Sequence, residues 1–181
     1  MLAYNFKNVR ILIVESSPEL FELFRGVFRL FTVPERNIDS AYSMDEGFEK
    51  FASGNHDLVI IDWLQTPDRG IELTRKIRMS DRSPNPFVPI IMTAGSGHEN
   101  RVTRARDAGV SEYLVKPFTA KTLAKKIERI VENPRQFVVS DNYVGPDRRS
   151  GRGGYEGPER RQQTAEQAES RMGGVAAKEA E

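Results

Sequence analysis

The sequence contains no cysteine and no long apolar run. Without cysteine the chain cannot form a disulfide scaffold, a thiolate metal site or a cysteine nucleophile, and this absence fits a reducing compartment. No stretch approaches the roughly 18 apolar residues of a membrane span, and the amino terminus lacks the basic-then-apolar pattern of a signal peptide. We therefore expect a cytoplasmic protein with no membrane partner.

The chain also lacks an excess of charge of one sign. It carries 27 Lys and Arg residues against 26 Asp and Glu residues, a net charge of +1. No overall basic field is present to recruit nucleic acid, so we do not expect a nucleic-acid partner.

Large aliphatic residues are scarce toward the end of the chain. Residues 1–133 alternate apolar runs with helical patterns, whereas Gly, Pro, Arg, Glu, Gln and Ala dominate residues 134–181. A segment of that composition cannot bury enough apolar surface to fold. We predict one domain over residues 1–133 and a disordered tail over residues 134–181, which is too poor in apolar residues to be a folded DNA-binding domain.

Within the domain, apolar runs of strand length alternate with segments of helical periodicity. The apolar runs lie near residues 9–14, 38–41, 58–62, 89–92 and 113–115, and the helical patterns near residues 18–31, 43–51, 71–79, 99–107 and from 119 onward. Strict alternation favours parallel pairing through right-handed crossovers, with helices on both faces of the sheet. We predict an α/β fold, a doubly wound five-stranded parallel sheet with five helices.

Three of the apolar runs end at residues that carry chemistry. The third run ends at Asp62, the fourth stops at Thr93, and the fifth stops at Lys116. Because open α/β sheets bind ligands at the carboxyl ends of their strands, we expect these side chains to meet in one crevice. An acid, a hydroxyl and an ammonium together are suited to phosphoryl transfer.

These features occur as an ordered set of motifs. The first strand ends in an acid, Ile11-Leu-Ile-Val-Glu15, and the third reads Leu58-Val-Ile-Ile-Asp62-Trp63, with Gly70 eight residues after Asp62. Thr93-Ala94 and Tyr113-Leu-Val-Lys116-Pro117-Phe118 follow. Over residues 7–132 the chain resembles the receiver domain of bacterial two-component response regulators, in the format of stand-alone, chemotaxis-type regulators. The resemblance implies a flavodoxin-like sheet of order 2-1-3-4-5.

The resemblance also implies roles for the residues of the crevice. Asp62 is the expected phosphoacceptor, with a sensor histidine kinase or a phosphotransfer protein as donor, and the chain is not expected to be an enzyme beyond assisting its own phosphorylation and dephosphorylation. Lys116 and Thr93 are expected to bind phosphoryl oxygens, which fits the need to offset their charge. The bond between Lys116 and Pro117 is expected to be cis.

The expected metal site departs from the family pattern. Receivers present two adjacent acids after the first strand, whereas this chain has Glu15 and Ser16. The implied ligands of Mg²⁺ are Glu15, Asp62 and the backbone carbonyl of Leu64, with Ser16 offering only a neutral hydroxyl. Mg²⁺ is usually held by one or two carboxylates with water and phosphate, so we expect a weakened site.

The serine at position 16, where the family has an acid, leaves two hypotheses for the function open. In the first, the protein is a working phosphoacceptor; in the second, it is a pseudo-receiver, a protein-interaction module that phosphate does not control. Retention of Asp62, Thr93 and Lys116 favours the first. A hydrolase of the haloacid type would need a second acid where this chain has Leu64, and a flavin-binding protein would need a phosphate-cradling loop after the first strand.

The resemblance further implies a switch. Thr93 is expected to move toward the phosphoryl group and Tyr113 to swing inward, changing the face formed by the last two helices and last strand of the domain and thereby the contact with a downstream protein. We expect that face to carry a basic cluster that either binds an acidic partner or is an ordinary solvated helix surface. The cluster comprises Arg101, Arg104, Lys121, Lys125 and Lys126.

The predicted tail contains an internal repeat. Tyr143-Val-Gly-Pro-Asp-Arg-Arg149 recurs twelve residues later as Tyr155-Glu-Gly-Pro-Glu-Arg-Arg161. An aromatic ring and paired arginines suit recognition of an acidic or phosphorylated surface. The pattern indicates either a docking motif used twice or an inert solubilising tail.

Overall fold

The protein folds around one parallel sheet with helices on both faces. The structure, a computed structural model, describes residues 6–63 and 68–148. The main sheet has five strands in the order β2-β1-β3-β4-β5, all paired in parallel. Its strands are β1 (Ile11–Val14), β2 (Ile38–Ala41), β3 (Leu58–Asp62), β4 (Ile90–Ala94) and β5 (Glu112–Val115). This is the flavodoxin-like order that the resemblance implies.

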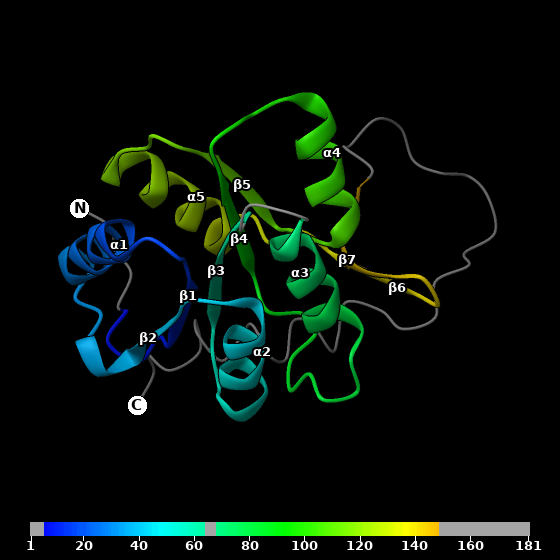
Figure 1. The fold of residues 1–181 in the computed structure, drawn as a ribbon, viewed down its shortest axis with the longest axis horizontal. Helices are drawn as coiled ribbons and strands as arrows, with labels where there is room; N and C mark the ends of the chain where they lie inside the picture. Colours follow the sequence, from blue (N-terminus) through cyan, green and yellow to red (C-terminus); the bar gives the residue numbers. More distant parts are fainter. Residues whose placement is uncertain (1–5, 64–67, 149–181) are drawn as a thin grey trace.

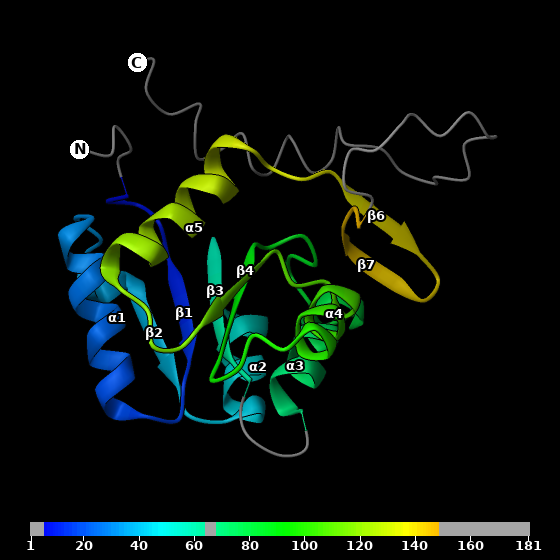
Figure 2. The same cartoon turned by 90° about the horizontal axis from the view of Figure 1, so that it is seen from above.

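The helices alternate with the strands and divide into two layers. They are α1 (Pro18–Leu30), α2 (Met44–Ser53), α3 (Arg69–Met79), α4 (Glu99–Ala108) and α5 (Ala120–Glu132), with a 3-10 turn η1 (Glu35–Asn37) before β2. Helices α1 and α5 cover one face of the sheet, and α2, α3 and α4 cover the other (Figures 1 and 2). Among residues 6–63 and 68–148, no helix is both long enough and apolar enough to cross a membrane.

Each face of the sheet has its own apolar core. Alternate residues of β1 point to opposite faces, so Ile11 and Ile13 pack with Phe24 and Phe28 of α1, whereas Leu12 belongs to the core beneath α2 and α3. All four strand residues of β1 are buried, as expected for a sheet covered on both sides. The two cores hold the strand ends in a rigid frame.

Side-chain caps set the beginnings of three helices. Ser17, Ser43 and Thr119 each accept a hydrogen bond from a backbone N–H in the first turn of α1, α2 and α5. In α1, Pro18 follows the cap, where its missing N–H costs no helical hydrogen bond.

The structure corrects the predicted boundary of the tail. We predicted no fold from residue 134 onward, but β6 (Phe137–Ser140) and β7 (Tyr143–Pro146) form an antiparallel hairpin that packs on α3 and α4. The β-branched residues of the first strand and the two-residue turn are ordinary hairpin signals, and the Gly-Pro of the repeat masked them. Pro146 is tolerated because it ends a strand of a two-stranded sheet.

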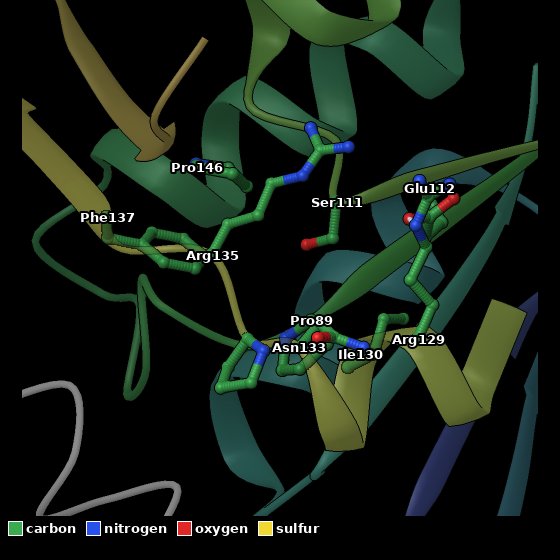
Figure 3. Close-up of a pocket in the computed structure, with 10 residues that line it drawn as sticks. Pro89, Ser111, Glu112, Arg129, Ile130, Asn133, Arg135, Phe137 and Pro146 are labelled. Carbon is green, nitrogen blue, oxygen red and sulfur yellow. Dashed lines mark ion pairs between the residues drawn. The ribbon is translucent and has the colours of Figure 1, made fainter. Parts of the chain in front are cut away.

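The hairpin is anchored to the domain by aromatic contacts. The Phe137 and Phe87 rings meet edge to face, 5.6 Å apart, and Val144 is buried. A shallow pocket separates the hairpin from the end of α5, with Arg135, Asn133 and Ser111 on its walls (Figure 3). The second copy of the repeat, residues 155–161, lies outside the described residues.

Candidate functional site

Strand register brings four chemistry-bearing residues to one edge of the sheet. Val14 pairs with Ile61, so Glu15 directly after β1 lies level with Asp62 at the end of β3. Asp62 itself pairs with Thr93 of β4. The next pair along is Ala94 with Val115, which places Lys116 immediately beyond β5 at the same edge.

The Lys116 ammonium lies between two carboxylates. Its Nζ atom donates to Oδ1 of Asp62 at 2.7 Å and to Oε2 of Glu15 at 2.6 Å. Only 2% of the Glu15 side chain and 12% of the Asp62 side chain are exposed, so these charges interact in a medium much less polar than water. The peptide bond that follows, Lys116–Pro117, is cis, the isomer that we predicted.

Thr93 completes the trio. Its side chain is fully buried, and its hydroxyl donates to Oδ1 of Asp62 across a long 3.4 Å contact. A hydrogen bond of that length is weak, so the hydroxyl lies beside the carboxylate and remains able to donate to another oxygen. The structure therefore brings together the acid, the hydroxyl and the ammonium that the sequence analysis expected to meet.

A close approach to the backbone at the end of β3 explains the glycine at position 70. A Cβ atom at Gly70 would lie 2.3 Å from the backbone oxygen of Asp62. The backbone N–H of Gly70 instead donates to the Trp63 carbonyl at 3.1 Å, and its carbonyl accepts from the Thr74 hydroxyl. Helix α3 can thus begin directly against the end of β3.

A cluster of cationic side chains around Trp63, the residue after Asp62, was not foreseen. The Trp63 indole N–H donates to Asp68 at 3.1 Å, and Asp68 also pairs with Arg104 of α4. The guanidinium groups of Arg101 and Arg104 lie 5.2 Å and 5.8 Å from the Trp63 ring centroid. Sequence patterns offer no signal for this cluster, because it depends on how α4 lies across the sheet edge.

The basic residues expected to form a partner face therefore have different surroundings. Arg101 and Arg104 contact Trp63 next to Asp62, whereas Lys126 pairs with Glu112 of β5 at 2.8 Å. Lys121 and Lys125 are exposed on α5.

Tyr113 is partly buried against the core and is bonded to the loop between β4 and α4. Its hydroxyl donates to the Ser96 carbonyl at 2.6 Å, in the loop between β4 and α4. Partial burial raises the pKa of the Tyr113 phenol, so the group stays protonated and remains a donor over the physiological range. The ring connects β5 to the loop that follows Thr93.

The donor set for a metal is small. Glu15 and Asp62 supply two carboxylates, Ser16 is exposed beside them, and Leu64 lies outside the described residues. Within residues 6–63 and 68–148, no group of three or more His, Cys, Asp and Glu side chains is arranged to hold a metal ion. Two carboxylates fit the sparse protein coordination that Mg²⁺ accepts when water and phosphate complete its shell.

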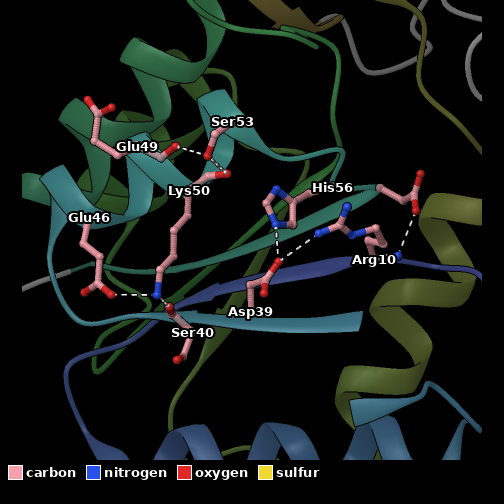
Figure 4. Close-up of polar contacts among 9 residues, drawn as sticks. Arg10, Asp39, Ser40, Glu46, Glu49, Lys50, Ser53 and His56 are labelled. Atoms are coloured by element: carbon pink, nitrogen blue, oxygen red, sulfur yellow. Dashed lines mark hydrogen bonds and ion pairs between the residues drawn. The ribbon is translucent and has the colours of Figure 1, made fainter. Parts of the chain in front are cut away.

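A second polar cluster lies before the amino ends of β1 and β3, at the opposite edge of the sheet. His56 Nε2 lies 2.9 Å from Asp39 Oδ2, which also pairs with Arg10 (Figure 4). Burial lowers the pKa of His56, although Asp39 opposes that shift. The imidazole also stacks on Phe51, and it takes no part in the site around Asp62.

Comparison with known proteins supplies relatives over most of the domain. Residues 11–128 match the response regulator receiver domain family. Chemotaxis protein CheY-3 of Vibrio cholerae is 29% identical over 129 residues, 70% of this chain and 94% of that protein. Chemotaxis protein CheY of Pseudomonas aeruginosa is 30% identical over 127 residues, 68% of this chain and 97% of that protein.

Solved structures agree with the fold. The response regulator protein TrrA from Thermotoga maritima, in complex with Mg²⁺ and BeF, is similar with a TM-score of 0.56 and 30% identity. The match covers 67% of this chain and 98% of TrrA. Chemotaxis protein CheY4 of Vibrio cholerae, at 22% identity and a TM-score of 0.60, shares the fold over 67% of this chain and 98% of its own.

Proposed function

Because this chain belongs to the response regulator receiver domain family of two-component signalling, we propose that Asp62 accepts a phosphoryl group from a histidine kinase or phosphotransfer protein. The observation that carries the proposal is the convergence of Lys116 and Thr93 on one oxygen of Asp62. A buried carboxylate that faces both an ammonium and a hydroxyl donor is arranged for phosphoryl transfer.

The proposed step forms one bond and breaks one bond. A carboxylate oxygen of Asp62 attacks the phosphorus, and the bond between phosphorus and the donor's histidine nitrogen breaks, leaving that electron pair on the nitrogen. Lys116 shifts its charge from the carboxylates toward the phosphoryl oxygens, and Thr93 donates its hydroxyl hydrogen bond to another of them. The chain assists a transfer for which the donor supplies the phosphoryl group.

Mg²⁺ would be held by Glu15 and Asp62, and when bound it would neutralise charge on the phosphoryl oxygens. The Thermotoga maritima relative binds Mg²⁺ together with BeF, which supports a metal of this kind in the family. With only Ser16 beside Glu15, this chain is expected to bind the ion weakly.

The proposed output runs from Thr93 to Tyr113. Movement of the Thr93 hydroxyl toward a phosphoryl group would free space beside β4, and Tyr113 would leave the Ser96 carbonyl to fill it. A downstream protein would then bind the altered surface of α4, β5 and α5. Replacing Tyr113 by Phe removes the hydrogen bond to the Ser96 carbonyl that holds the ring in its present position.

Intact mass spectrometry tests the proposal. The full chain is incubated with Mg²⁺ and acetyl phosphate, and the wild type is compared with Asp62→Asn and with Asp45→Asn, which changes an exposed acid on α2. We expect one phosphoryl-sized mass gain in the wild type and in Asp45→Asn, and none in Asp62→Asn. No gain with Mg²⁺ or Mn²⁺ at any concentration would leave the pseudo-receiver as the better description.

A further inference from the structure

The first copy of the repeated motif is bound to the end of α4. The Arg148 guanidinium lies over the Tyr143 ring, 3.7 Å from its centroid. The same guanidinium donates to the backbone carbonyl of Asp107 at 3.0 Å and pairs with the Asp107 carboxylate at 3.3 Å. The Tyr143 hydroxyl turns back to donate to the Pro146 carbonyl at 2.8 Å. The aromatic and arginine positions of the motif therefore shape the segment and attach it to the helix.

The glycine of the motif is required by a close backbone approach. A Cβ atom at Gly145 would lie 2.7 Å from the Cα atom of Gly109. Gly109 ends α4 with φ +95°, and a Cβ atom there would lie 2.6 Å from the Val144 carbonyl oxygen. At the position of Gly145, the surface at the end of α4 therefore has room for a glycine and for no larger residue.

Buried hydrogen bonds hold that surface in place. Arg78 of α3 donates through Nε and Nη2 to the Gly109 carbonyl, at 3.0 Å and 2.9 Å, and through Nη1 to the carbonyls of Pro86 and Val88, both at 2.7 Å. Its guanidinium also lies 5.2 Å from the Phe137 ring centroid, under the hairpin. Asp107 and Gly109 are therefore presented by a preorganised frame.

Four contact-making residues of the first copy recur in the second. Tyr143, Gly145, Pro146 and Arg148 correspond, twelve positions later, to Tyr155, Gly157, Pro158 and Arg160. One packed position differs, because buried Val144 corresponds to Glu156. The second copy keeps the attachment groups and the glycine that the surface demands.

We propose that the surface formed by Asp107 and Gly109 is a docking site for Tyr-x-Gly-Pro-acid-Arg segments, and that residues 155–160 of the same chain exchange with residues 143–148 on it. The first copy is favoured, because Val144 is apolar and because β6 and β7 are joined by a two-residue turn. A longer loop costs only slowly increasing entropy, so the second copy remains within reach. Each exchange releases one copy for another partner.

Nuclear magnetic resonance of the full chain tests the exchange through the backbone amide signals of Asp107 and Gly109. Copy one is disabled by Tyr143→Ala with Arg148→Ala, copy two by Tyr155→Ala with Arg160→Ala, and a third variant carries all four changes. We expect the copy-two variant to match the wild type and the four-change variant to show undocked signals. The copy-one variant should retain at least a severalfold larger docked population than the four-change variant.

A gain-of-docking variant provides the complementary measurement. Glu156→Val in the copy-one variant should increase the docked population severalfold, with no dependence on protein concentration. Unchanged amide signals from the sheet, such as that of Ile60, verify that each variant is folded. The proposal would be overturned if the copy-one and four-change variants gave the same Gly109 signal, or if docking rose with protein concentration.

Discussion

The Nζ atom of Lys116 lies 2.6 Å from the Oε2 atom of Glu15, although the residues are 101 positions apart in the chain. The same ammonium lies 2.7 Å from Asp62. Glu15 therefore has two roles at the site. It shares the Lys116 ammonium with Asp62, and it is a proposed metal ligand. A phosphoryl group that draws Lys116 away would leave Glu15 in need of another positive charge, which a bound Mg²⁺ would provide.

Lys116→Met should destabilise the fold, because it leaves two largely buried carboxylates without their shared cation. We expect a loss of about 2–3 kcal/mol near neutral pH, below the upper range for breaking a buried pair, since 18% of the Lys116 side chain is exposed. Urea unfolding at pH 7 measures the loss. Lys121→Met, which changes an exposed lysine on α5, is the control and should shift stability by less than about 0.5 kcal/mol. Equal losses in the two variants would contradict a special role for Lys116.

Ser16→Asp should strengthen Mg²⁺ binding, because it adds a carboxylate beside Glu15. Trp63 follows the acceptor directly and is the only tryptophan, so its fluorescence can report the titration. We expect the midpoint to fall by about tenfold or more, the effect of roughly 1.4 kcal/mol. Ser16→Asn has nearly the same size without the charge and should stay close to the wild type. If both variants titrate alike, the ion is held elsewhere.

Arg78→Met should weaken both the domain and its hairpin. The substitution leaves the buried carbonyls of Gly109 and Val88 and the partly buried carbonyl of Pro86 without their donor, and each loss at a buried carbonyl costs about 1–3 kcal/mol. We expect a total loss of about 3 kcal/mol or more in chemical unfolding, with faster hydrogen exchange over residues 137–146. Arg75→Met alters an exposed arginine on the same helix and serves as the control. Slow exchange in the hairpin of Arg78→Met would show that Arg78 does not support it.

His56 should make stability fall as the pH drops below about 6.5. Burial lowers the pKa of His56 in the folded protein, whereas the unfolded chain keeps the usual value near 6.5. Below 6.5 the unfolded state therefore binds the proton first, and the free energy of unfolding decreases with falling pH, by at most about 1.4 kcal/mol per unit. Unfolding curves between pH 5 and 7.5 measure the slope.

His56→Gln should flatten that slope, whatever its effect on stability at pH 7.5. His98→Gln removes the other histidine, which is exposed, and should leave the slope unchanged. A slope that persists in His56→Gln would assign the pH dependence to other groups.

Much of the fold was predictable because local signals agree with the global arrangement. Apolar runs and helical periodicity located the sheet and its helices, and the observed caps at Ser17, Ser43 and Thr119 are residue types that favour helix starts. The hairpin was missed for two reasons: the Gly-Pro of the repeat argued against a strand, and the low apolar content averaged over residues 134–181 hid the short run at 137–139. That run is stable as a strand because Phe87 and Arg78 lie beneath it.

The residues at the centre of the candidate site were predictable from the sequence, whereas the contacts around them were not. Strand-end positions pointed to Asp62, Thr93 and Lys116 because parallel strands finish at a common edge. The contact of Arg101 and Arg104 with Trp63, and the bond from Tyr113 to Ser96, depend on where α4 and its preceding loop lie. No periodicity or spacing encodes that placement.

By itself, the sequence determined the kind of fold, the residues at the strand ends and the presence of a repeated motif, because these follow from patterns that are local in the chain. Only the tertiary structure decided that Lys116 bridges Glu15 and Asp62, and that the first copy of the motif is docked on Asp107. Those contacts join distant segments, and their geometry is set by how helices pack across a sheet rather than by any neighbouring residues.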